Sequence, residues 1–118
     1  MEILDPLTHE PLLDEDGNAF IWLVTDIHAP AAKKVRNEFN NKYKGNKLPS
    51  AEASEAAQLD LIATCVVGFK NKIKLNGETI DHSFKTVRSI LKKSPAIRSQ
   101  VDDEAGNVAN HIKAALES

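Results

Sequence analysis

The segment LDLIATCVVGFKNKIKLNGETIDHSFKTVRSILKKSP, residues 59–95, contains the patterns that decide the fold. It begins with a dense apolar run, continues through a glycine-containing turn, and ends with a short helical pattern that stops at Ser94-Pro95. The residues before it supply an N-terminal arm, a strand and a first helix, and the residues after it supply a last helix. We therefore predict a mainly α domain (α+β) with four helices, an N-terminal strand or hairpin, and a short β-hairpin.

The apolar run is expected to form the second half of a helix that begins after Ser50 and reaches residue 69. Ser50 is a good N-cap, and the alanine-rich residues that follow it favour a helix. Periodicity alone also allows a buried strand in the run. Because residues 56–69 are apolar nearly all round, we expect them inside a bundle or beneath a subunit interface. Cys65 has no His or Asp nearby to activate it, so we expect a small buried hydrophobe.

Asn76-Gly77 is the strongest short-range signal for a two-residue hairpin turn. The register that this turn sets pairs Ile73 with Ile80 and Leu75 with Glu78. A two-stranded hairpin is marginal alone, so it must pack on the helices.

Two amphipathic helices are predicted after the hairpin. Ser83 caps the first, whose expected inward residues are Phe84, Val87, Ile90 and Leu91. Ser94 caps the second, and Pro95 suits its first position. Apolar residues recur along this last helix at three- or four-residue steps, namely Ile97, Val101, Ala105, Val108, Ile112 and Leu116.

Upstream, we divide the chain into an N-terminal arm, residues 1–19, and a single helical domain, residues 20–118. Pro6 and Pro11 disfavour a helix in the arm. Its segment DEDGN, residues 14–18, has the composition of a turn. A calcium loop aligned on Gly17 would place leucines where its first and twelfth ligands are required, so we expect a turn there.

The segment FIWLVT, residues 20–25, is the best predicted strand, and residues 7–13 could pair with it across the turn. Phe20 and Trp22 would share one face, with Ile21 and Leu23 on the other. A strand that is apolar on both faces either packs in a core or offers a surface to a partner. Core packing is the simpler interpretation.

The first helix is predicted to start at Pro30, with an apolar stripe of Ala32, Val35, Phe39 and Tyr43. Its cations, which could serve a nucleic-acid-binding module, are Lys33, Lys34, Arg36, Lys42 and Lys44. Since the whole chain has a net charge of -2, we expect an ordinary solvated face and no nucleic-acid partner.

The sequence contains no specific catalytic motif, so we expect no enzyme, no cofactor and no metal site. The four histidines lack the helical spacing of zinc motifs, and neither a phosphate loop nor a dinucleotide fingerprint is present. A single cysteine excludes an internal disulfide and fits a reducing compartment. The N-terminus does not resemble a signal peptide, and the longest apolar run is about a third of the ~20 residues that span a bilayer. We therefore expect a cytoplasmic protein with no membrane partner.

Residues 20–101 resemble the tail assembly chaperones of long-tailed bacteriophages and prophages. The resemblance lies in the order of several short motifs: a strand leading to Ala29-Pro30, then Val67-Gly68-Phe69, Asn76-Gly77-Glu78, Ser83-Phe84, Leu91 and Pro95-Ala96-Ile97. The chain departs from the family at Phe69, where Trp is frequent, and in its arm, which has no counterpart.

The resemblance implies a chaperone that is absent from the finished virion. Such proteins bind and solubilise the hydrophobic tape measure protein in the host cytoplasm, self-associate into rings or spirals, and are replaced by the major tail tube protein. The expected contact residues for client and self are Phe20, Trp22, Leu61, Val66 and Phe69. Two rivals remain: a structural tail component, such as a tube, connector or completion protein, and a small regulatory nucleic-acid-binding module.

Overall fold

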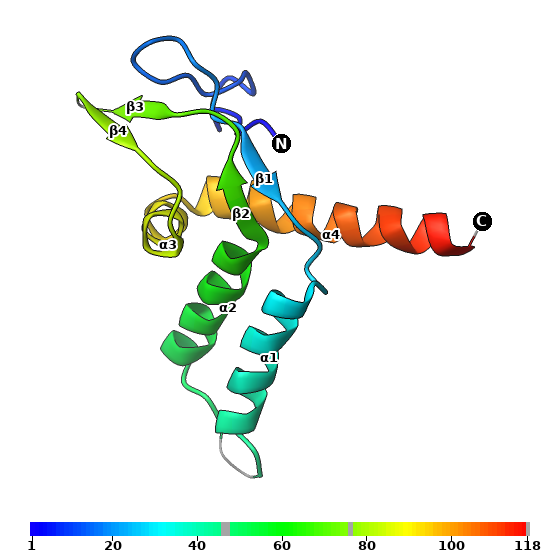
Figure 1. The fold of residues 1–118 in the computed structure, drawn as a ribbon. Helices are drawn as coiled ribbons and strands as arrows, with labels where there is room; N and C mark the ends of the chain where they lie inside the picture. Colours follow the sequence, from blue (N-terminus) through cyan, green and yellow to red (C-terminus); the bar gives the residue numbers. More distant parts are fainter. Residues whose placement is uncertain (46–47, 76, 118) are drawn as a thin grey trace.

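The computed structural model describes residues 1–45, 48–75 and 77–117, and the side chains of residues 75, 109–115 and 117 are also outside its description. Four helices and two antiparallel strand pairs occur in this described part, which confirms the predicted α+β class (Figure 1). In chain order the elements are β1 (Trp22–Val24), α1 (Pro30–Lys42), α2 (Ala51–Cys65), β2 (Val66–Phe69), β3 (Ile73–Leu75), β4 (Glu78–Ile80), α3 (Phe84–Lys93) and α4 (Pro95–Glu117).

The helix α2 is shorter than predicted. It stops at Cys65, and the next four residues form β2, which runs antiparallel to β1 with Trp22 opposite Phe69 and Leu23 opposite Gly68. The expectation of a helix through residue 69 was therefore wrong, and the strand alternative holds for residues 66–69. β-branched Val66 and Val67 favour a strand, and the pairing satisfies backbone groups of β1 that a helix would leave open.

The predicted hairpin is present with the predicted register. Ile73 lies opposite Ile80 and Leu75 opposite Glu78, and Gly77 has a φ of +78°, which glycine adopts without strain. Asn76, the other turn residue, lies outside the described residues. The hairpin is fixed to the N-terminal arm, because the backbone N–H of Lys74 donates to the Asp14 carboxylate at 2.8 Å.

The first three residues of the arm pack along the free edge of β1, and Ile3 contributes to the core. The N–H of Ile3 donates to the carbonyl of Phe20, and the N–H of Trp22 donates to the carbonyl of Met1, both at 2.8 Å. The Ile3 side chain is fully buried. Phe20 also donates its N–H to the carbonyl of Leu12, at 3.0 Å, so residues 7–13 meet the predicted strand 20–25 at its first residue. Beyond that point the partners of the strand are residues 1–3 and β2.

A single main core joins the arm, the β1–β2 pair and three helices. Its most buried side chains are Ile3, Trp22, Ile73, Val87, Leu91 and Val101. The predicted caps Ser50, Ser83 and Ser94 each accept a hydrogen bond from the N–H three residues later. Phe84 is the exception among the expected inward residues: it is 48% exposed, because it is the first residue of α3 and lies at the outer end of that helix.

Two parts of the chain extend away from this core (Figure 1). The antiparallel pair α1–α2 points in one direction, and the second half of α4 points in another. The radius of gyration is 15.8 Å, whereas a compact domain of this length has about 13.5 Å. Much of the helical surface is therefore available to other molecules.

Candidate interaction surfaces

The five predicted contact residues divide into core and partly accessible positions. Phe20, Trp22 and Val66 are at most 6% exposed and belong to the main core. Leu61 and Phe69 are half-buried, and Phe69 stacks on Trp22 with ring centroids 5.2 Å apart. A partner could reach the first three only by opening the fold, so the accessible apolar surface must be sought elsewhere.

The β1–β2 pair and the residue before it carry accessible apolar side chains, which we name the open face: Ile21, Leu23 and Val67. Leu23 is 45% exposed and Val67 is 58% exposed. Figure 1 shows α4 passing behind the strand pair, with no helix in front of it. The sequence analysis did not select Leu23 and Val67 as contact residues, although the alternation of side chains along β1 already placed Leu23 on the other face of the strand from Trp22.

Gly68 keeps the open face flat. It lies directly opposite Leu23, and a Cβ built at Gly68 would be 3.3 Å from Cδ1 of Leu23. The register shifts between Leu23 and Val24, so Val67 has no partner opposite it in β1. The shift is typical of a β-bulge, which redirects a side chain out of the regular ladder. Val67 therefore stands outside the regular ladder, and its side chain is exposed.

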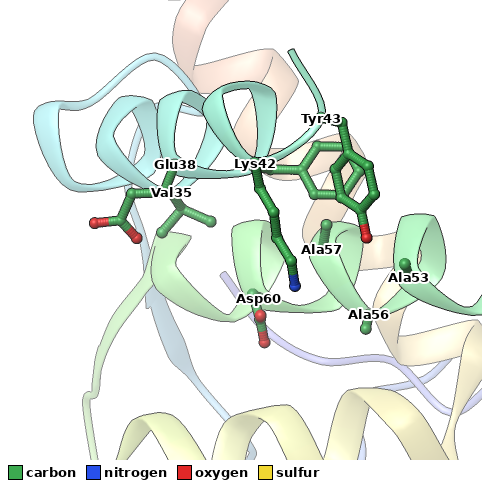
Figure 2. A pocket seen from close by; sticks show the side chains of 9 residues that line it. Val35, Glu38, Lys42, Tyr43, Ala53, Ala56, Ala57 and Asp60 are labelled. Atoms are coloured by element: carbon green, nitrogen blue, oxygen red, sulfur yellow. The ribbon is translucent and has the colours of Figure 1, made fainter. Parts of the chain in front are cut away.

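A hollow of about 290 Å³ lies between α1 and α2 (Figure 2). Its floor on α2 is formed by the small side chains of Ala53, Ala56 and Ala57, and Lys42 and Tyr43 reach over it from α1. The carboxylate of Asp60 at its edge is engaged by α3: its Oδ1 is 2.6 Å from Nε of Arg88. The hollow thus offers apolar contact with a charged rim, and its lining contains no nucleophile paired with a base.

The cations of α1 lie mostly on its outer surface. Lys33, Lys34, Lys42 and Lys44 are exposed, whereas Arg36 is half-buried and donates to the carbonyl of Ile27 at 3.2 Å. Arg36 thus helps to hold the loop before α1. These four lysines are exposed to solvent, as the sequence predicted, and Lys42 also reaches over the hollow (Figure 2).

Asp14 is a structural carboxylate at the turn of the arm. It is only 8% exposed, and its oxygens accept backbone N–H bonds from Asp16, Asn18 and Lys74 at 2.8–3.0 Å. These hydrogen bonds, above all the one from Lys74, lower the pKa of the carboxyl group because they stabilise its charged form. Gly17 has a φ of +81°, so this segment is the expected turn.

Cys65 is fully buried at the end of α2. Burial, followed by the charges of Asp102 and Asp26, raises the pKa of the thiol to about 11, with a smaller opposing effect of Arg36. The thiol therefore stays protonated and behaves as the small hydrophobe that the sequence predicted.

Within the described ranges, no three His, Cys, Asp or Glu side chains are grouped so that they could hold a metal ion. None of the helices in this part of the chain has the length and apolar character needed to cross a bilayer. No family model, curated protein or solved structure matches this chain.

Proposed function

We propose that this chain is an assembly chaperone for a long phage tail. It binds and solubilises the tape measure protein in the host cytoplasm, associates with copies of itself, and is displaced by the major tail tube protein. The proposal takes its client from the sequence resemblance. The structural observation that supports it best is the open face, where Leu23 and Val67 expose apolar surface on a strand pair that is fixed to the core.

The size of the open face suits reversible binding. Full burial of a Leu or Val side chain contributes about 1.5–3 kcal/mol, so side chains that are already half-buried would contribute about 1 kcal/mol each. One copy would therefore bind an apolar client segment weakly. Several associated copies along one client chain would bind much more tightly, because each further contact is intramolecular. Weak individual contacts also allow the tail tube protein to replace the chaperone stepwise.

The direct test is co-expression with the tape measure protein encoded beside this chain. We expect the client to move from the insoluble to the soluble fraction and to co-purify with the chain. A client that stays insoluble and uncomplexed in the presence of the wild-type chain would refute the proposal.

A matched pair of variants tests whether the open face carries the binding. Leu23→Asp/Val67→Asp should abolish co-purification of the client, because it places two carboxylates in an apolar contact. Leu7→Asp/Leu48→Asp makes the same chemical change at two leucines that are 90% exposed away from that face, and it should leave client recovery unchanged. Circular dichroism of each variant checks that it is folded.

The two rival functions predict different results. A structural tail component would be found in purified tails, whereas the chaperone is expected to be absent from them. A nucleic-acid-binding module using the lysines of α1 would bind DNA with a strong dependence on salt concentration, because bound phosphates release counterions.

A further inference from the structure

The two halves of α4 differ in their relation to the core of the domain (Figure 1). In its first half Ile97, Val101 and Ala105 are buried in the domain. Beyond them the helix extends past the core to Glu117 (Figure 1), and Leu116 near its end is 82% exposed. Isolated helices shorter than ~12–15 residues are marginal in water. This segment therefore gains stability if another surface packs against it.

A surface of matching length lies on α1–α2. The helix α1 has 13 residues, and the segment of α4 that follows buried Ala105, residues 106–117, has 12, so both segments are about 18–20 Å long. A second hollow, of about 170 Å³, opens on the α1–α2 pair, and the apolar part of its lining is Val35, Phe39, Ala57 and Leu61. Apolar side chains of a helix laid along α1 could enter this hollow.

The charges on the two segments are complementary. Asp103 and Glu104 stand where α4 leaves the core, and Lys42 and Lys44 stand at the far end of α1. The described ion pairs are Arg88–Asp60 and Arg98–Glu55, so within the described residues none of these four side chains is paired. Figure 1 shows the far end of α1 pointing away from α4, which keeps the two sets apart within one chain.

We propose that the occupant of this surface is α4 of a second copy of the chain, lying antiparallel to α1. In that orientation Asp103 and Glu104 of one copy meet Lys42 and Lys44 of the other. Val108, four residues beyond Glu104, then comes level with Phe39 at the hollow, and Leu116, about 18 Å beyond Glu104, lies level with the start of α1. The helix dipoles are then also antiparallel. The inference rests on the self-association in the proposed function and names the surfaces that carry it.

Charge reversal tests the contact without any client. Sedimentation velocity of the wild-type chain over a range of concentrations should show reversible association that weakens with salt. Lys42→Glu/Lys44→Glu and Asp103→Lys/Glu104→Lys should each weaken association about tenfold or more, since attraction becomes repulsion at two positions. An equimolar mixture of the two variants should associate again, because the reversed charges on α1 of one variant then meet the reversed charges on α4 of the other.

Two further variants separate this contact from general effects. Lys72→Glu/Lys85→Glu changes net charge by the same amount at exposed lysines elsewhere and should leave association unchanged. Leu116→Asp should weaken association even at high salt, because it places a carboxylate at the apolar end of the contact. A monomeric wild-type chain, or a mixture of charge-reversed variants that stays dissociated, would overturn the inference. Either result leaves client binding to be judged by co-expression, so the two proposals can fail separately.

Discussion

Replacing Ile3 by alanine tests whether residues 1–19 form a separate arm or part of the domain. Ile3 is fully buried among the core side chains, and its backbone pairs with both Phe20 and Leu12. The substitution removes three methyl or methylene groups, worth about 0.8 kcal/mol each, and the remaining cavity brings the expected loss of stability to about 3 kcal/mol. Over the chain's 118 residues, this corresponds to a fall in Tm of about 12 °C.

Urea unfolding followed by tryptophan fluorescence measures this loss, because Trp22 is the single tryptophan and lies in the same core. We expect a lower midpoint with an unchanged slope, which indicates that the same structure unfolds cooperatively. Leu7→Ala is the control within the arm: Leu7 is 90% exposed, and its loss should change stability by less than about 0.5 kcal/mol. If Ile3→Ala also changes the free energy of unfolding by less than about 0.5 kcal/mol, the arm opens independently and does not belong to the core.

Three further predictions follow from single contacts. Because the pKa of Asp14 is lowered in the folded state, its carboxylate stabilises the fold above its ordinary pKa of 3.8, and this contribution is lost as pH falls through the folded-state pKa. Asp14→Asn should therefore be less stable than the wild type near neutral pH and lose less stability on acidification, as measured by urea unfolding at several pH values. Because burial raises the pKa of the Cys65 thiol to about 11, a thiol reagent near neutral pH should label the folded chain very slowly and the urea-unfolded chain rapidly; equal rates would contradict the burial. Ser50→Ala removes the hydrogen bond from the N–H of Ala53 and should lower the free energy of unfolding by about 1 kcal/mol, as measured by thermal melts. Ser54→Ala, one turn inside α2, should be neutral or slightly stabilising in the same assay.

Local sequence information was sufficient wherever one short segment decides its own conformation. Asn76-Gly77 predicted the register of the β3–β4 pair, and serine caps marked the starts of three helices. In each case the hydrogen bonds or dihedral angles belong to neighbouring residues. The apolar spacing of α3 and α4 likewise predicted that Val87, Leu91 and Val101 are buried.

The end of α2 and the accessible surface were decided only by tertiary structure. Val66–Phe69 continue an apolar run in which helix and strand look alike, and only the presence of β1 beside them selects a strand. The same pairing buries Trp22 and Val66, which the sequence offered as contact residues, and exposes Leu23 and Val67 instead. The sequence by itself determined where helices and turns begin and which residues are apolar. Which apolar residues face solvent depended on how distant segments pair, because burial is a property of the assembled core and not of any one segment.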